Sequence, residues 1–150
     1  MRAVRGYALL WAAIVLLDRI TKTWIVTYVP ECLPITSFLS WDLTFNRGIS
    51  WSMFHTDAQI PFLVVTCAVI LVTLVLGYYT CMRYTQRQLI VGEIMVLAGS
   101  MSNIIDRIWY GGVVDFIRVH YQQWSYPSFN GADAAIVIGV ACMLWEYYTE

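Results

Sequence analysis

Two short segments, G-G-V-V-D-F-I at residues 111–117 and S-F-N-G-A-D-A-A at residues 128–135, decide the architecture of this chain. The first contains Asp115 and the second contains Asp133. The second also stands where a polar loop gives way to an apolar run that ends near Tyr148. A carboxylate at a membrane boundary is costly, and acidic residues in such positions are usually functional. Two of them flanking one loop therefore indicate a functional site.

The composition is typical of a membrane protein. Of the 150 residues, 59% are apolar and only 13% are charged, which is far from the average of soluble domains. The formal net charge is −1 and the nine Lys and Arg residues are scattered, so the chain lacks the basic patch of a nucleic-acid-binding protein. We expect a single membrane domain over residues 1–150 that does not bind nucleic acid.

The spacing of the cysteines and histidines indicates neither a disulfide framework nor a metal site. No C-x-x-C or H-E-x-x-H pattern occurs. The residues concerned are Cys32, Cys67, Cys81, Cys142, His55 and His120. We expect the cysteines to be small buried apolar side chains, and we expect no metal ion and no cofactor.

Four segments approach the roughly 20 apolar residues that a membrane-spanning helix needs. They are residues 7–28, 61–80, 89–105 and 133–148. The first could be mistaken for a signal peptide, but no small-residue cleavage site follows it and the apolar run resumes after Lys22. We therefore predict an all-α integral membrane protein built as a bundle of four transmembrane helices.

An even number of spans places both termini on one side of the membrane. Arginines concentrate in the short segments on that side, which predicts cytoplasmic termini. The opposite, extracytoplasmic end collects most of the unusual polar residues, and a bundle held only by packing has no need of this clustering. These residues are Asp18, Lys22, Asn46, Asn103, Asp106, Arg107, Asp115, Asn130 and Asp133.

The connection between the first two spans, residues 30–58, has the pattern of a strand. Trp41, Leu43 and Phe45 alternate with polar residues, which is the period of a strand with one apolar face, and Gly48 permits a turn. We predict a small extracytoplasmic flap of sheet-like structure. For the tryptophans alone, an ordinary belt of interfacial aromatic residues is the favoured alternative.

Other polar residues have more than one interpretation. Asp18 and Lys22 are four residues apart, the spacing of an ion pair on one helical face. Asp106 and Arg107 fit an exposed ion pair at a helix end, whereas the amide of Asn103, so near hydrocarbon, needs hydrogen-bond partners. Glu93, inside the third span, fits either a proton relay or a bond between helices.

Asp115 and Asp133 are the best candidates for chemistry. The apolar neighbours of Asp115 predict a raised pKa. Asp133 is expected in the first turn of a helix, where the dipole and free N–H groups stabilise a carboxylate and where Asn130 or Ser128 could be the cap. Two carboxyl groups in such different surroundings can share one proton, as in an aspartic protease. For Asp133 alone, a helix-capping role is an equal alternative.

Five segments together resemble the bacterial lipoprotein signal peptidases, also called signal peptidase II. They occur in the family's order over nearly the whole chain. They are D-R-I-T-K at 18–22, F-N-R-G-I-S-W-S-M-F at 45–54, G-S-M-S-N-I-I-D-R at 99–107, G-G-V-V-D-F at 111–116 and F-N-G-A-D-A-A-I at 129–136. The third is poorer in glycine than is usual in the family, and Ile49 and Trp51 replace a small residue and Phe.

The resemblance implies a four-helix aspartic endopeptidase of the bacterial inner membrane. Such an enzyme removes the signal peptide of a prolipoprotein immediately before a diacylglyceryl-modified cysteine. By their match to the family's motifs, Asp115 and Asp133 are the catalytic aspartates. The positions that shape the site or hold substrate are Asp18, Lys22, Asn46, Gly48, Gly99, Asn103, Arg107, Asn130 and Ala132. Membrane lipid and globomycin-type inhibitors are the other expected partners.

Two further functions fit parts of the pattern. A small proton-coupled transporter or channel subunit also carries acidic and basic residues in its spans. It would place them along a path through the bilayer or at helices broken near its midplane, whereas here they gather at one end and only Glu93 lies apart. A non-catalytic membrane scaffold is the second alternative.

Overall fold

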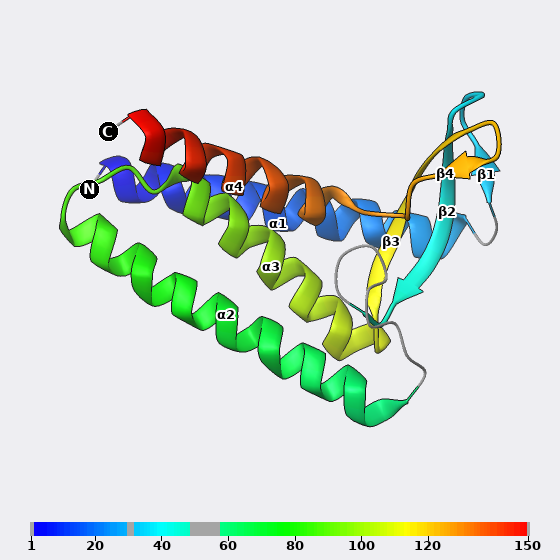
Figure 1. Ribbon diagram of the computed structural model, residues 1–150, viewed down its shortest axis with the longest axis horizontal. Coiled ribbons are helices and arrows are strands. Elements are labelled where there is room, and N and C mark those ends of the chain that lie inside the picture. Colours follow the sequence, from blue (N-terminus) through cyan, green and yellow to red (C-terminus); the bar gives the residue numbers. More distant parts are fainter. Residues whose placement is uncertain (1, 30–31, 49–57, 150) are drawn as a thin grey trace.

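The computed structural model describes residues 2–29, 32–48 and 58–149 (Figure 1). In these ranges four helices form a bundle, and an antiparallel sheet of four strands lies at one end of it. Both termini lie at the other end (Figure 1). The elements are α1 (Arg2–Tyr28), β1 (Leu33–Pro34), β2 (Leu39–Asn46), α2 (Gln59–Thr85), α3 (Val91–Tyr110), β3 (Val113–Tyr121), β4 (Trp124–Ser125) and α4 (Gly131–Thr149).

Each predicted span overlaps one helix. The helices extend beyond the apolar runs, since α1 begins at Arg2 and α3 continues to Tyr110. The shortest, α4, has 19 residues. At about 1.5 Å per residue it measures roughly 28 Å, close to the roughly 30 Å thickness of the hydrocarbon layer. The prediction of four long helices is confirmed.

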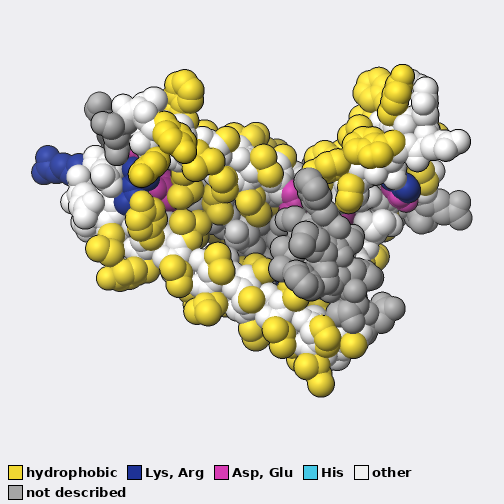
Figure 2. Space-filling view, viewed as in Figure 1, with side chains coloured by type: hydrophobic (Ala, Val, Ile, Leu, Met, Phe, Trp, Pro, Cys, Tyr) yellow, Lys and Arg dark blue, Asp and Glu magenta, His cyan; other side chains and the backbone are white. Residues whose placement is uncertain are grey.

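Among the described helices, α2 alone is long and apolar enough by composition to cross a membrane. Many of its large apolar side chains, including Ile60, Val64 and Val72, are exposed, as expected of a lipid-facing helix. The other three helices carry acidic or basic side chains near their ends. Figure 2 shows hydrophobic side chains over most of the helical surface and charged ones at a few places. That all four helices cross a membrane stays a prediction.

The central helix is α3, which packs against α1, α2 and α4. Its approach to α4 is close because the contact residues are small. A Cβ added to Gly99 would overlap the carbonyl oxygen of Ala132, and one added to Gly92 would lie 2.6 Å from the carbonyl oxygen of Gly139. Glycine therefore sets the spacing between α3 and α4, both at the first turn of α4 and near its middle.

The sheet is larger than the predicted flap. Strand β2 contains the predicted strand residues 41–46 and pairs antiparallel with β3, with Asn46 opposite Val113 and Thr44 opposite Asp115. A mostly helical chain with a small antiparallel sheet agrees with the predicted helices and flap. The sequence placed Asp115 in the loop after the third span, whereas it lies on β3. The apolar run around it is too short to show a period of its own. Residues 49–54 of the predicted flap, and His55, lie outside the described residues.

An apolar cluster joins the sheet to the end of α1. Ile25, Val29 and Phe116 are buried together, and Trp41 packs against them. The ring of Trp41 also meets that of Trp24 edge to face, with centroids 4.9 Å apart. The strand that carries Asp115 is thus fixed to the helical bundle.

The prediction that the cysteines are buried is wrong. All four are free and exposed. Cys67 and Cys81 lie on α2 and Cys142 on α4, on helix surfaces that face away from the bundle. An apolar run is compatible with a lipid-facing surface as well as with a protein core, so its sequence does not distinguish the two.

Candidate active site

Asp115 and Asp133 reach one site from two elements. Helix α3 is followed by its C-cap Gly111, whose φ of 67° is left-handed, a conformation that glycine adopts without strain. This residue turns the chain from α3 into β3, where Asp115 is buried. Asp133 lies in the first turn of α4 and is partly exposed.

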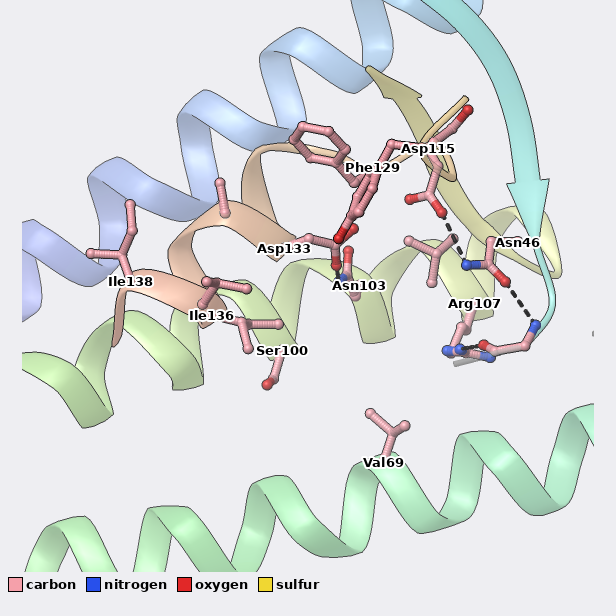
Figure 3. A pocket seen from close by; sticks show the side chains of 16 residues that line it. Asn46, Val69, Ser100, Asn103, Arg107, Asp115, Phe129, Asp133, Ile136 and Ile138 are labelled. Carbon is pink, nitrogen blue, oxygen red and sulfur yellow. Dashed lines mark hydrogen bonds between the residues drawn. The ribbon is translucent and has the colours of Figure 1, made fainter. Parts of the chain in front are cut away.

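Both carboxyl oxygens of Asp115 accept side-chain amide protons, and Figure 3 shows the one from Asn46. Asn46 Nδ2 donates to Oδ2 at 3.0 Å and Asn130 Nδ2 donates to Oδ1 at 2.6 Å. Asn46 is itself oriented, because its Oδ1 accepts the backbone N–H of Gly48 at 2.9 Å. The direction of the Asp115 carboxyl group is therefore set by two asparagines.

Asp133 takes part in a reciprocal helix cap. The Oδ1 of Asn130 accepts the backbone N–H of Asp133 at 2.9 Å, and Asp133 Oδ2 accepts the backbone N–H of Asn130 at 3.2 Å. This is the geometry of a capping box, with Asn130 rather than Ser128 as the cap. Asp133 Oδ1 also accepts a hydrogen bond from Asn103 Nδ2 at 2.8 Å. The capping role and a role in the site are thus compatible.

Burial raises the pKa of Asp115 to about 7, and the neighbouring Asp133 acts in the same direction. The amides of Asn46 and Asn130 and the charge of Lys22 oppose this rise in the pKa. Near neutral pH the Asp115 carboxyl group is therefore divided between its protonated and ionised forms, in line with the prediction from its apolar neighbours.

A cavity of about 420 Å³ opens over both carboxyl groups (Figure 3). One part of its lining is polar and includes Asn46, Gly48, Ser100, Asn103, Arg107, Asp115, Ser128 and Asp133. The other part is apolar and includes Val69 of α2 together with Ile136, Val137 and Ile138 of α4. The cavity therefore offers two ionisable acids beside a surface suited to hydrocarbon.

Arg107 is buried at the edge of this cavity. Its guanidinium donates to the carbonyl oxygen of Gly48 and lies 5.7 Å from the centre of the Phe62 ring. It does not form the exposed pair with Asp106 that its position allowed, because the two side chains face different elements. Its Nη1 is buried and has no hydrogen-bond partner among the described residues, which leaves one donor for a bound molecule.

Asp18 and Lys22 form the predicted ion pair within a larger buried cluster. Lys22 Nζ lies 2.8 Å from Asp18 Oδ2, 2.7 Å from Asp106 Oδ2 and 2.9 Å from Asn103 Oδ1. Arg19 adds an ion pair to Asp106 Oδ1 at 2.5 Å. Sequence reasoning assigned no such partners to Asp106 and overlooked Arg19, although Arg19 directly follows Asp18.

The remaining predicted site residues have packing roles. Gly99 and Ala132 form the close contact between α3 and α4. Among the residues that the structure describes, no group of three His, Cys, Asp or Glu side chains could hold a metal ion.

Glu93 lies at the opposite end of the bundle and bonds helices together. It pairs with Arg83 at 2.6 Å, and Arg83 also pairs with Glu146 at 3.0 Å. This answers the alternative left open by the sequence in favour of a bond between helices. In the described part of the chain, the buried charges gather at the two ends of the bundle and not along a path through it.

Residues 10–149 match the profile of the family described as signal peptidase (SPase) II. The chain belongs to the signal peptidase II family. It is 39% identical to the lipoprotein signal peptidase of Teredinibacter turnerae over 94% of this chain and 84% of the relative. It is 36% identical to that of Mesorhizobium japonicum over 97% of this chain and 87% of the relative.

Two solved structures of bacterial membrane enzymes, determined by the in meso method, share the fold. One has a TM-score of 0.79 at 22% identity, covering 97% of this chain and 89% of the other. The second has a TM-score of 0.73 at 25% identity, covering 96% and 93%. A lipoprotein signal peptidase processes the signal peptides of prolipoproteins, and this chain is a bacterial membrane peptidase of that family. A transporter function has no support.

Proposed function

We propose that the protein is an aspartic endopeptidase whose catalytic residues are Asp115 and Asp133, and that it cleaves prolipoproteins immediately before the diacylglyceryl-modified cysteine. The observation that carries the proposal is that both acids line one cavity and share Asn130 as a hydrogen-bond partner. Two carboxyl groups held this way can divide the roles of acid and base.

The different surroundings of the two acids support an assignment of roles. The more deeply buried Asp115, whose pKa is about 7, begins as the protonated acid. Asp133, partly exposed at the positive end of α4, begins as the carboxylate. Asp133 takes a proton from a water molecule while the water oxygen bonds to the peptide carbonyl carbon, and Asp115 gives its proton to the carbonyl oxygen.

The second step restores both acids. Asp133 passes its new proton to the peptide nitrogen, the carbon–nitrogen bond breaks, and Asp115 takes a proton from one hydroxyl of the tetrahedral carbon. The products are the signal peptide's carboxyl end and the free amine of the modified cysteine. No metal ion or cofactor takes part in this scheme.

The lining of the cavity supports a lipid-modified substrate. Arg107 Nη1 is the donor for a substrate carbonyl oxygen, since it is buried without a partner among the described residues. The apolar part around Val69 and Ile136 (Figure 3) accommodates an acyl chain or an apolar side chain of the signal peptide. Globomycin-type inhibitors would occupy the same cavity and compete with substrate.

The proposed location is the bacterial inner membrane, with four spans and cytoplasmic termini. Exposed tryptophans at the sheet end, Trp24, Trp109 and Trp124, support a membrane surface at that level, where tryptophan is enriched. The cavity then lies at the extracytoplasmic edge of the hydrocarbon layer, where water is available to the two acids.

The test is cleavage of a diacylglyceryl-modified prolipoprotein by the purified protein. Wild type should release the signal peptide, and Asp115→Asn and Asp133→Asn should each abolish release. Asp42→Asn is the control, because Asp42 pairs with Arg118 in the sheet, away from the two acids, and should cleave normally. Cleavage at the wild-type rate by either active-site variant would reject the mechanism. Stabilisation by globomycin in a thermal-shift assay is an independent test of the ligand.

A further inference from the structure

A buried carboxylate holds the backbone N–H of the residue just before each proposed catalytic aspartate. Val114, which precedes Asp115, donates its N–H to Asp106 Oδ2 at 3.1 Å. Ala132, which precedes Asp133, donates its N–H to Asp18 Oδ1 at 2.9 Å. The two acids that lie farther from the cavity therefore fix the backbone that carries the two acids inside it.

One ammonium group joins these two supporting carboxylates. Lys22 Nζ lies 2.8 Å from Asp18 Oδ2 and 2.7 Å from Asp106 Oδ2. The exposed fractions of Asp18, Lys22 and Asp106 are 3%, 1% and 0%. Charged groups paired at these distances in a buried site resist displacement, because separating them would leave an uncompensated charge.

Neighbouring side chains complete the cluster. Ser102 donates its hydroxyl proton to Asp18 Oδ2 at 2.6 Å, and Arg19 pairs with Asp106 Oδ1 at 2.5 Å. Every carboxylate oxygen of Asp18 and Asp106 thus has a partner, and the two acids are balanced by two bases. A polar cluster whose members are all satisfied is rigid.

This cluster lies behind the cavity and not on its surface, where a substrate-binding group would lie. Asp18, Lys22 and Asp106 are absent from the lining of the cavity. They connect α1 and α3 to β3 and to the start of α4, the two elements that carry the aspartates. Along the chain these elements are joined only through the rest of β3, β4 and the connection up to Asn130. The cluster is a much shorter link between them, and it acts together with the backbone bridge between Ile117 of β3 and Phe129.

We propose that Asp18, Lys22 and Asp106 form a brace that sets the relative position of the two catalytic aspartates. In this brace Asp106 is a positioning residue for Asp115, Asp18 is a positioning residue for Asp133, and Lys22 couples the two. The inference rests on the proposed function, since it assigns a role relative to those aspartates. The apparent pKa values of two acids that share a proton depend on the distance between them. The brace therefore acts on turnover rather than on substrate binding.

The experiment compares Asp18→Asn, Asp106→Asn and the double variant in the cleavage assay. Asparagine keeps an acceptor for the backbone N–H but loses the ion pair with Lys22. Each single variant should lower kcat by about 10- to 100-fold, the loss expected from a small misplacement of reacting groups, with KM changed less than about threefold. Because both changes act through Lys22, the double variant should be no worse than about the poorer single variant.

One control and one further variant separate positioning from general stability. Glu93→Gln removes an equally buried, ion-paired acid at the opposite end of the bundle, so it should lower the unfolding temperature but keep kcat and its pH profile. The brace variants should instead move the two apparent pKa values of the kcat profile. Ser102→Ala removes a neutral donor to Asp18 and an acceptor for Arg19 Nε but leaves both carboxylates in place. It should lower kcat in the same direction and replaces an Asp variant that fails to fold.

The brace would be overturned if its variants kept the wild-type kcat and pH profile. It would also be overturned if the losses of kcat in the two single variants multiplied in the double variant. The same preparations must include Asp115→Asn and Asp133→Asn. If these two are inactive while the brace variants are normal, the brace alone is rejected. If these two remain active, the proposed function itself fails.

Discussion

Asn130 donates a hydrogen bond of 2.6 Å to Asp115 through its side-chain nitrogen. The oxygen of the same amide accepts the backbone N–H of Asp133 at 2.9 Å. The oxygen is committed to the helix cap, so the planar amide holds its nitrogen on the side of the site, where it donates to Asp115 and, at 3.3 Å, to Asn103 Oδ1. The cap of α4 thus determines the orientation of a carboxyl group on β3.

Replacement of Asn130 by aspartate should separate these two functions. Aspartate is as good a helix cap as asparagine, but it presents an oxygen to Asp115 where the amide presented a donor. We expect Asn130→Asp to lose about 100-fold or more in kcat, the cost of removing a donor to a reacting group. The unfolding temperature should also fall, because the new carboxyl group is buried beside Asp115 and Asp133. Ser125→Ala, on β4 and outside the lining of the cavity, is the control and should retain kcat. Full activity of Asn130→Asp would contradict the role assigned to Asn130.

The raised pKa of Asp115 predicts a pH-dependent stability. Its ordinary value is 3.8 and its value in the folded protein is about 7, so between these pH values the folded state binds more protons than the unfolded state. The contribution of the Asp115 carboxyl group to the free energy of unfolding is therefore fully present below about pH 4 and is lost as the pH rises through 7. The variant Asp115→Asn has no carboxyl group at this position and does not show this loss. We expect the unfolding temperature of the variant minus that of wild type to rise from pH 4 to pH 8; a constant difference would argue against a raised pKa.

Arg107→Lys should weaken substrate binding. The guanidinium holds the Gly48 carbonyl oxygen, and its Nη1 has no partner among the described residues, whereas a lysine ammonium group cannot reproduce this planar geometry. Loss of one hydrogen bond to a charged donor predicts an increase in KM of about tenfold or more. Arg118→Lys is the matched control, since Arg118 is exposed and pairs with Asp42. An unchanged KM in Arg107→Lys would remove the proposed substrate contact.

Gly99→Ala tests the close contact between α3 and α4. Its new Cβ would overlap the carbonyl oxygen of Ala132 and displace the turn that carries Asp133. We expect a loss of about 1–3 kcal/mol in stability, the usual cost of overpacking, together with a lower kcat. In Gly77→Ala the nearest atom to the new Cβ is 4.0 Å away, so this variant should be neutral or slightly stabilised. Equal unfolding temperatures for the two variants would show that the contact is not tight.

The sequence predicted the parts of this structure that depend on local periodicity. Apolar runs located the four helices, and the spacing of Asp18 and Lys22 predicted their ion pair. The strand around Asp115 was missed because its partner, Thr44 on β2, is distant in the sequence. The hydrogen bond from the Val114 N–H to Asp106 could not be predicted either, since the backbone N–H group meets this carboxylate only after the chain has folded. Exposure of the cysteines depends on which helix face meets lipid, which composition does not specify.

The reciprocal cap of Asn130 and Asp133 also has a consequence for the order of assembly. Three of the groups that complete the site, namely the Asn130 amide, the Ala132 N–H and the Asp133 carboxylate, belong to the last helix and its cap. A chain with only its first three helices in place has Asp115 and the supporting charges but not the second acid. The proposed catalytic pair therefore forms only when α4 docks, and under this proposal a partly inserted chain does not cleave its neighbours.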